Sequence, residues 1–176
     1  MAHKTKRETA ENRETLEIVT LGNDVLRQKA SPVAKINAET ARIVEALLHT
    51  LYVGKGVGLA GPQVGLLQRI FVVHVDKDIP RVFINPSLLE TSEETVKYEE
   101  GCLSIPGVWV QVLRPKALRI HAWNEKGRSF TQDADGILAR VILHEYDHLE
   151  GTLFIDRLSE TKRNRILAKI EKQQRA

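Results

Sequence analysis

The sequence is poor in cysteine and in long apolar segments. Cys102 is the only cysteine among 176 residues, so no disulfide can form within the chain. There is no run of eighteen apolar residues, which a membrane-spanning helix would need. We also expect no secretory signal, and the sequence has no internal repeat or low-complexity stretch. We therefore expect a cytoplasmic protein in a reducing compartment, with no membrane partner.

What the chain does contain is enough apolar surface for one domain, since 42% of its residues are hydrophobic and can form a core. We predict that residues 16–176 form this single domain and that residues 1–15 form a flexible, solvated tail. The tail carries Glu8, Glu11 and Glu14 among its basic residues. Organelle transit peptides are poor in acidic residues, so the tail does not fit that class.

The most informative motif is HEYDH at residues 144–148. On a helix, residues four apart share a face, so both imidazoles can bind one divalent ion with Glu145 beside it as a base. Apolar residues at helical spacing, including Ile137 and Val141, place both histidines on a stripe that faces the core. The alternative is two packed core histidines. We favour the metal site, because burying two imidazoles and a carboxylate without partners is costly.

A catalytic ion of this kind needs a third protein ligand and an open position for water. Metalloproteases with the longer HExxHxxGxxH pattern use a third histidine, but Phe154 stands at that position here. Asp156, Glu160 and Glu171 remain possible ligands, as in zinc proteases that use a later glutamate.

Cys102 is a better candidate for the third ligand. It lies in EGCLSIPG at residues 100–107, where glycine and proline indicate a bent, closely approached backbone. Its thiolate would persist in a reducing compartment. The alternative is a small buried hydrophobic residue, the commonest role of a free cysteine.

A third segment, GVGLAGPQVG at residues 56–65, is rich in glycine. It lacks the Lys-Ser/Thr that completes a phosphate-binding P-loop, and it follows an expected helix rather than a strand. A turn is its simplest interpretation. It also offers backbone that a ligand can approach, and Gln63 can donate a hydrogen bond from its amide.

Hydrophobic periodicity outlines the remaining elements. A helix is expected over residues 38–53, and strands over residues 69–75, 81–84, 94–99, 117–123 and 129–133, the last two joined by a turn at 124–127. A final helix begins near residue 159. The predicted fold class is α+β, with mostly antiparallel sheets around a central metal-binding helix and with a C-terminal helix.

Together, the three segments resemble the peptide deformylase family, whose signatures GxGLAxPQ, EGCLS and HExxH all occur here in the same order. The resemblance runs from about Ile18 to the C-terminal helix. Gly61 stands where the family more often has alanine. The resemblance implies that the domain is catalytic and that it removes the formyl group from N-formylmethionine of newly made polypeptides, releasing formate.

Position by position, the resemblance implies that Cys102, His144 and His148 bind the metal and that water takes the fourth site. Glu145 would act first as base and then as acid. The amide of Gln63 and the backbone N–H of Leu103 would stabilise the oxyanion.

Two other functional classes stay open. A metallopeptidase would need a metal ligand downstream of the HEYDH motif in place of Cys102. An inactive metal-binding adaptor would need neither Glu145 nor Gln63.

The ligand set does not name its metal, because zinc and ferrous iron both accept it and zinc usually binds more tightly in vitro. The resemblance implies one Fe(II) per chain in cells, with zinc, nickel or cobalt as substitutes. A thiolate-bound iron site would be sensitive to oxidation.

Five further residues are candidates for substrate binding. Val57, Ile137 and Val141 would form an apolar slot for the methionine side chain, with ordinary core packing as the alternative. Gly58 and Gly101 would pair by backbone with the peptide as an added strand.

Glu100, next to Cys102, is a candidate to orient a ligand histidine through its free N–H. A surface ion pair is the alternative for this carboxylate.

The expected C-terminal helix is basic: residues 159–176 have a net charge of +4. A solvated amphipathic helix is its simplest interpretation. The resemblance also makes it a candidate for docking on the ribosome, where the substrate emerges. We expect no DNA partner.

Overall fold

The computed structural model describes residues 13–176. The predicted N-terminal tail therefore lies outside the described residues over positions 1–12. Residues 13–15 have no regular secondary structure, and Arg13 lies 3.8 Å from the carboxylate of Glu45 on the first helix. The division into a tail and a single domain stays a prediction.

Three α-helices and seven strands make up the described chain. They are α1 (Ala38–Val53), β1 (Gly58–Ala60), β2 (Ile70–Val73), β3 (Arg81–Thr91), β4 (Thr95–Cys102), β5 (Ile105–Pro115), β6 (Ala117–Trp123), β7 (Ser129–Asp135), α2 (Gly136–Leu149) and α3 (Glu160–Arg175). Three short 3-10 helices lie between them: η1 (Asp24–Arg27), η2 (Gly61–Val64) and η3 (Phe154–Arg157).

Five antiparallel strands form the main sheet, in the order β1-β2-β3-β6-β7. Phe71 and Phe83 are register partners on β2 and β3, and their rings stack with centroids 4.7 Å apart. Both belong to the apolar cluster that also buries Ile142 of α2. The inner face of this sheet therefore fixes α2, the helix that carries the HEYDH motif.

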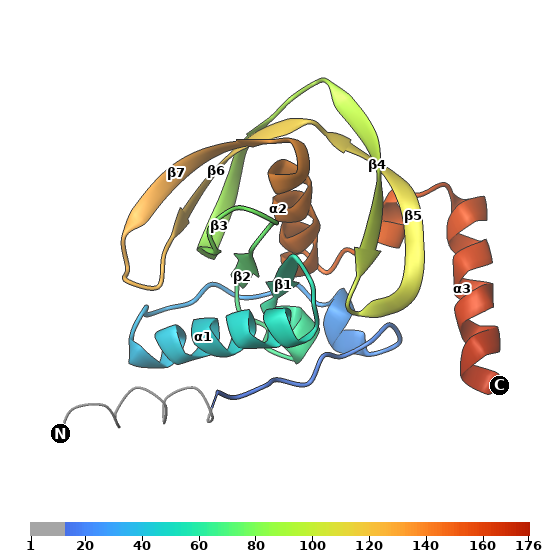
Figure 1. Cartoon of the computed structure of the whole chain (residues 1–176), viewed down its shortest axis with the longest axis horizontal. Coiled ribbons are helices and arrows are strands. Elements are labelled where there is room, and N and C mark those ends of the chain that lie inside the picture. The colour runs from blue at the N-terminus through green and yellow to red at the C-terminus, as the bar shows by residue number, and fades with distance from the viewer. Residues whose placement is uncertain (1–12) are drawn as a thin grey trace.

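The β4–β5 hairpin forms a separate two-stranded sheet. Figure 1 shows α2 between this hairpin and the main sheet, with α1 below and α3 outside the hairpin at the C-terminal end. Ile105 and Val112 of the hairpin share an apolar cluster with Phe154 of η3. This packing brings the end of β4 next to α2, although the two are far apart in the sequence.

Local sequence explains where the helices begin. Asn37 caps α1, because its side chain accepts hydrogen bonds from the backbone N–H groups of Glu39 and Thr40 at 3.1 and 3.2 Å. Ser159 caps α3 in the same way, with its hydroxyl accepting from the N–H of Lys162 at 3.4 Å.

The predicted α+β class is confirmed, as are the helices at 38–53 and at 144–148 and the antiparallel pairing of 117–123 with the strand that follows it. Two strands were missed: β1 within the glycine-rich segment, and β5. β3 also runs to Thr91, seven residues beyond the predicted end at 84. Among residues 13–176, no helix has the length and apolarity needed to cross a bilayer.

Candidate metal centre

Cys102 at the end of β4 and the two histidines of α2 meet in space. One ligand atom from each of Cys102, His144 and His148 lies within 4.8 Å of the others, and no other such group of three occurs in the described part of the chain. The Cys102 sulfur lies 3.4 Å from Nε2 of His148. A tetrahedral ion with bonds of about 2.3 Å to sulfur and about 2.05 Å to nitrogen would separate two such atoms by roughly 3.5 Å. The three donors therefore fit a divalent transition-metal ion.

The ring of His144 is oriented by a carboxylate. Its Nδ1 lies 2.9 Å from Oε2 of Glu100, which leaves Nε2 as the nitrogen available to an ion. Phe154 of η3 also supports this ring, because the two rings stack with their centroids 5.7 Å apart. His148 is buried, and its Nδ1 has no hydrogen-bond partner among residues 13–176.

Glu100 is ionised despite its burial. Burial opposes the charged form, but hydrogen bonds with His144 and Arg114 outweigh it and lower the pKa of Glu100 to about 2. Arg140 adds a third partner at 2.7 Å. The carboxylate is therefore buried behind the cluster rather than in a surface ion pair.

Glu145 is buried beside the cluster, and within the described part of the chain its Oε2 has no hydrogen-bond partner. Burial raises the pKa of Glu145 to about 7. A carboxyl group with such a pKa can both accept and release a proton near neutral pH. Gly58 of β1 lies directly against this side chain, so β1 passes close to the carboxylate.

Gln63 of η2 points its amide nitrogen at the cluster. Its Oε1 accepts a hydrogen bond from the N–H of Ala60 at 2.9 Å, which fixes which end of the amide faces inward. Nε2 then lies 3.4 Å from the sulfur of Cys102 and 3.2 Å from the hydroxyl of Ser104. The side chain is fully buried, so a polar donor is held in place at the site.

A cavity of about 440 Å³ opens beside the cluster. All predicted site residues except His148 line it: Val57, Gly58, Gln63, Glu100, Gly101, Cys102, Leu103, Ile137, Val141, His144 and Glu145. Val57 and Ile137 are 47% and 45% exposed, as expected of residues at an open mouth and not of an ordinary core. Val141 is buried deeper.

Sequence reasoning missed other residues of this cavity. Trp109 and Tyr98 of the hairpin and Arg140 of α2 also line it. Trp109 is 68% exposed, and a Cβ atom on Gly101 would lie 2.8 Å from its ring. Its place over Gly101 depends on the pairing of β5 with β4, which no local sequence pattern records.

The carboxylates considered as alternative ligands lie elsewhere. Asp156 accepts hydrogen bonds from the Arg27 guanidinium at 2.5 Å and from the N–H of Leu153 at 2.8 Å. Glu160 and Glu171 lie on α3, where they are exposed. None of the three belongs to the ligand group, so the ligand set of a metallopeptidase with a late glutamate is not formed.

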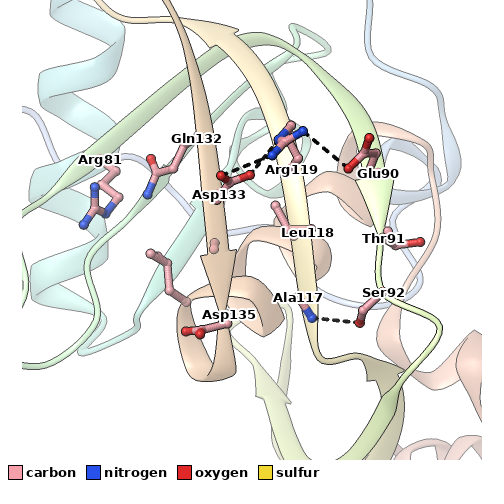
Figure 2. A pocket seen from close by; sticks show the side chains of 12 residues that line it. Arg81, Glu90, Thr91, Ser92, Ala117, Leu118, Arg119, Gln132, Asp133 and Asp135 are labelled. Carbon is pink, nitrogen blue, oxygen red and sulfur yellow. Dashed lines mark hydrogen bonds and ion pairs between the residues drawn. The ribbon is translucent and has the colours of Figure 1, made fainter.

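A second and larger recess, of about 610 Å³, lies across β3, β6 and β7 (Figure 2). Arg119 extends across it between Asp133 and Glu90, at 2.7 and 3.5 Å. These charges are exposed and paired with one another, and none belongs to a metal-binding group. The possible metal ligands therefore border the smaller cavity and not this recess.

Comparison with known proteins agrees with this geometry. The model of the family described as polypeptide deformylase matches residues 15–164. A peptide deformylase of Clostridium botulinum is 50% identical over 139 residues, covering 79% of this chain and 93% of the relative. That of Treponema pallidum is 44% identical over 149 residues, covering 85% of this chain and 91% of the relative.

Solved structures show the same likeness. The peptide deformylase of Synechococcus elongatus, in complex with actinonin, has a TM-score of 0.84 at 38% identity and covers 90% of this chain and 92% of its own. That of Thermotoga maritima has a TM-score of 0.80 at 42% identity, and the match covers 83% of this chain and 99% of the Thermotoga maritima chain. The three motifs, the converging ligands and these matches together show that this chain belongs to the polypeptide deformylase family.

Proposed function

We propose that Cys102, His144 and His148 hold the metal ion with which this deformylase removes the formyl group from N-formylmethionine of new polypeptides. One observation carries the assignment: a sulfur and two imidazoles from distant segments converge within 4.8 Å. A divalent ion held there would supply Lewis-acid chemistry, which makes hydroxide available near neutral pH. We propose Fe(II) as the ion in cells, with zinc, nickel or cobalt as substitutes.

Glu145 is the proton carrier in this proposal. It is buried beside the ligands with one carboxylate oxygen unpartnered, so it can take the proton of the attacking water. The same proton can then pass to the nitrogen that leaves when the C–N bond of the formamide breaks. The products are formate and a free amine, and Glu145 returns to its starting state.

Gln63 and Leu103 stabilise the developing charge. As the formyl carbon is attacked, its carbonyl oxygen gains negative charge and needs donors fixed in advance. The amide of Gln63 is fixed by Ala60, and its Nε2 already points at the cluster. The backbone N–H of Leu103, the residue after the ligand Cys102, is the second donor.

The cavity beside the cluster receives the methionine and the peptide that follows it. Val57, Ile137 and Val141 give it an apolar wall, which suits an unbranched thioether. Gly58 and Gly101 have no side chains and flank the cavity from β1 and β4, so a peptide backbone can approach and pair there as a strand.

The decisive experiment is metal analysis of anaerobically purified protein together with formate release from a formyl-Met peptide. His148→Ala should lose both the ion and activity. His121→Ala is the matched control, because His121 lies on β6 away from the ligands. Wild-type protein that binds no ion, or that cleaves internal peptide bonds without releasing formate, would refute the proposal.

We also propose that α3 docks on the ribosome in the cytoplasm. Lys162, Arg165, Lys169 and Lys172 are exposed and recur at helical spacing, so they form one basic face. Ile166, Leu167 and Ile170 pack against the body of the protein and hold the helix in place. The basic face is therefore free to meet the phosphates of ribosomal RNA.

Ribosome binding can be measured in sedimentation assays over a range of salt concentrations. Replacing Lys162, Arg165 and Lys169 by glutamate should weaken binding and flatten its salt dependence. The matched control changes Lys126 and Arg128, exposed basic residues at the β6–β7 turn. Equal affinity of the α3 variant and wild type would refute the docking role.

A further inference from the structure

Four buried charged residues lie behind the metal ligands, and one of them, Glu100, is hydrogen-bonded to a ligand side chain. Glu100 and Arg114 come from the β4–β5 hairpin, and Arg140 and Asp147 come from α2. Each is less than 8% exposed. Burying four charges is costly unless each is paired, so their arrangement calls for an explanation.

Arg114 joins the two carboxylates. Its Nε and Nη2 donate to the two oxygens of Glu100 at 2.5 and 3.0 Å, which makes a bidentate pair. Its Nη1 donates to Oδ2 of Asp147 at 2.8 Å. One planar guanidinium therefore ties Glu100 on the hairpin to Asp147 on α2, the residue just before the ligand His148.

Both oxygens of Glu100 are fully engaged. Oε1 accepts from Arg114 and from Nη1 of Arg140 at 2.7 Å, and Oε2 accepts from Arg114 and faces Nδ1 of His144 at 2.9 Å. Arg140 is itself held by the carbonyl oxygens of Val112 and Val96 at 2.9 and 2.6 Å. The carboxylate has no freedom to turn away from His144.

Asp147 is fixed from the outside by Arg157 of η3, whose Nη2 donates to Oδ1 at 2.6 Å. A continuous line of ion pairs thus runs from the partly exposed Arg157 through Asp147 and Arg114 to Glu100, and ends on the ring of a metal ligand.

We infer that Arg114 is a positioning residue for the metal site: it holds Glu100 in the orientation that fixes the ring of His144, and Asp147 holds Arg114. The inference rests on the proposed metal site. It differs from a purely structural role, because removal of Arg114 should change how fast the ion leaves the folded protein as well as the stability of the fold.

The test compares cobalt-loaded wild type with Glu100→Gln, Arg114→Lys, Arg114→Met and the double variant Arg114→Met/Glu100→Gln. Cobalt release is followed with excess chelator, and the cobalt absorption spectrum reports ligand geometry. Arg69→Met is the matched control. Arg69 is also buried and pairs with Glu150 at the end of α2 at 2.7 Å, but it makes no hydrogen bond to Glu100.

Glu100→Gln and Arg114→Met should release cobalt about 10- to 100-fold faster than wild type, as expected when the partner of a ligand histidine is lost. Arg114→Lys should release cobalt at a rate between those of wild type and Arg114→Met, because lysine keeps the charge but cannot form the bidentate pair. The double variant should release cobalt no faster than the faster single variant, since Arg114 acts through Glu100. Arg69→Met should match wild type.

The inference would be overturned if both Arg114 variants released cobalt at the wild-type rate. It would also be overturned if the increase in release rate in the double variant equalled the product of the increases in the two single variants. If Arg114→Met does not fold, Arg114→Lys alone decides. Failure of the wild type itself to take up cobalt, zinc or iron is a different result, because it would refute the proposed metal site on which the inference rests.

Discussion

Gly58 lies so close to Glu145 that a Cβ atom on it would fall 2.8 Å from the carboxylate carbon. Alanine at this position must therefore push the carboxylate aside, while none of the atoms that its Cβ would meet belongs to a metal ligand. We expect Gly58→Ala to lower kcat by about 100-fold, the effect of a misplacement of roughly 1 Å. Formate release and metal content measured on the same sample check this. Turnover equal to wild type would show that the carboxylate position is not critical.

Glu145→Gln removes the proton carrier but keeps the size and burial of the side chain. We expect turnover to fall by about 100- to 10,000-fold, the usual contribution of general acid–base catalysis. Metal content should stay at one ion per chain, because Glu145 is not in the ligand group. Anaerobic kinetics and metal analysis test both parts, and loss of the ion in this variant would contradict the role assigned to Glu145.

Gln63→Leu removes the amide donor. We expect turnover to drop by about 100- to 1000-fold, as for other lost oxyanion donors. The N–H of Ala60 loses its acceptor as well, so the free energy of unfolding should fall by about 1 to 3 kcal/mol. Kinetics, metal analysis and denaturant unfolding separate these effects. Loss of bound metal would argue that the amide supports Cys102 instead of the oxyanion.

The helix motif could be read from the sequence because its geometry is local. Two histidines four apart share a helical face wherever the helix lies, and the apolar residues around them fix the direction of that face. Cys102 was a candidate because it is unique in the chain and sits in a bent segment. Its distance from the histidines, however, depends on packing of the hairpin against η3, which no local pattern records.

The buried ion network and strand β5 were not predictable in the same way. Along β5 the buried positions include a charged residue, Arg114, next to exposed Leu113, so the apolar alternation that marks a strand is broken. Arg114 is buried only because Glu100 and Asp147, which lie 14 and 33 residues away in the sequence, neutralise it. A single sequence shows the charges but not the pairing.

The recess of Figure 2 provides a negative prediction. Arg119 lies there in exposed ion pairs with Asp133 and Glu90, and such pairs contribute little to stability. We expect Arg119→Gln to leave turnover and metal content unchanged and to have little effect on the free energy of unfolding, because solvent screens exposed ion pairs. Denaturant unfolding and formate release check this. A clear loss of activity would mean that the face of β3, β6 and β7 takes part in function.

Metal removal should destabilise the fold, because an ion that binds only the native state stabilises it by mass action. At a free zinc concentration about 100 times the dissociation constant, we expect the Tm of the metal-free protein to rise by roughly 5 to 10 °C. Cys102→Ser should show little of this rise, since a neutral hydroxyl replaces the thiolate. Thermal melts of both proteins over a zinc titration test it. An equal rise in the two would mean that zinc stabilises the chain without the sulfur, and the three-ligand centre would have to be reassigned.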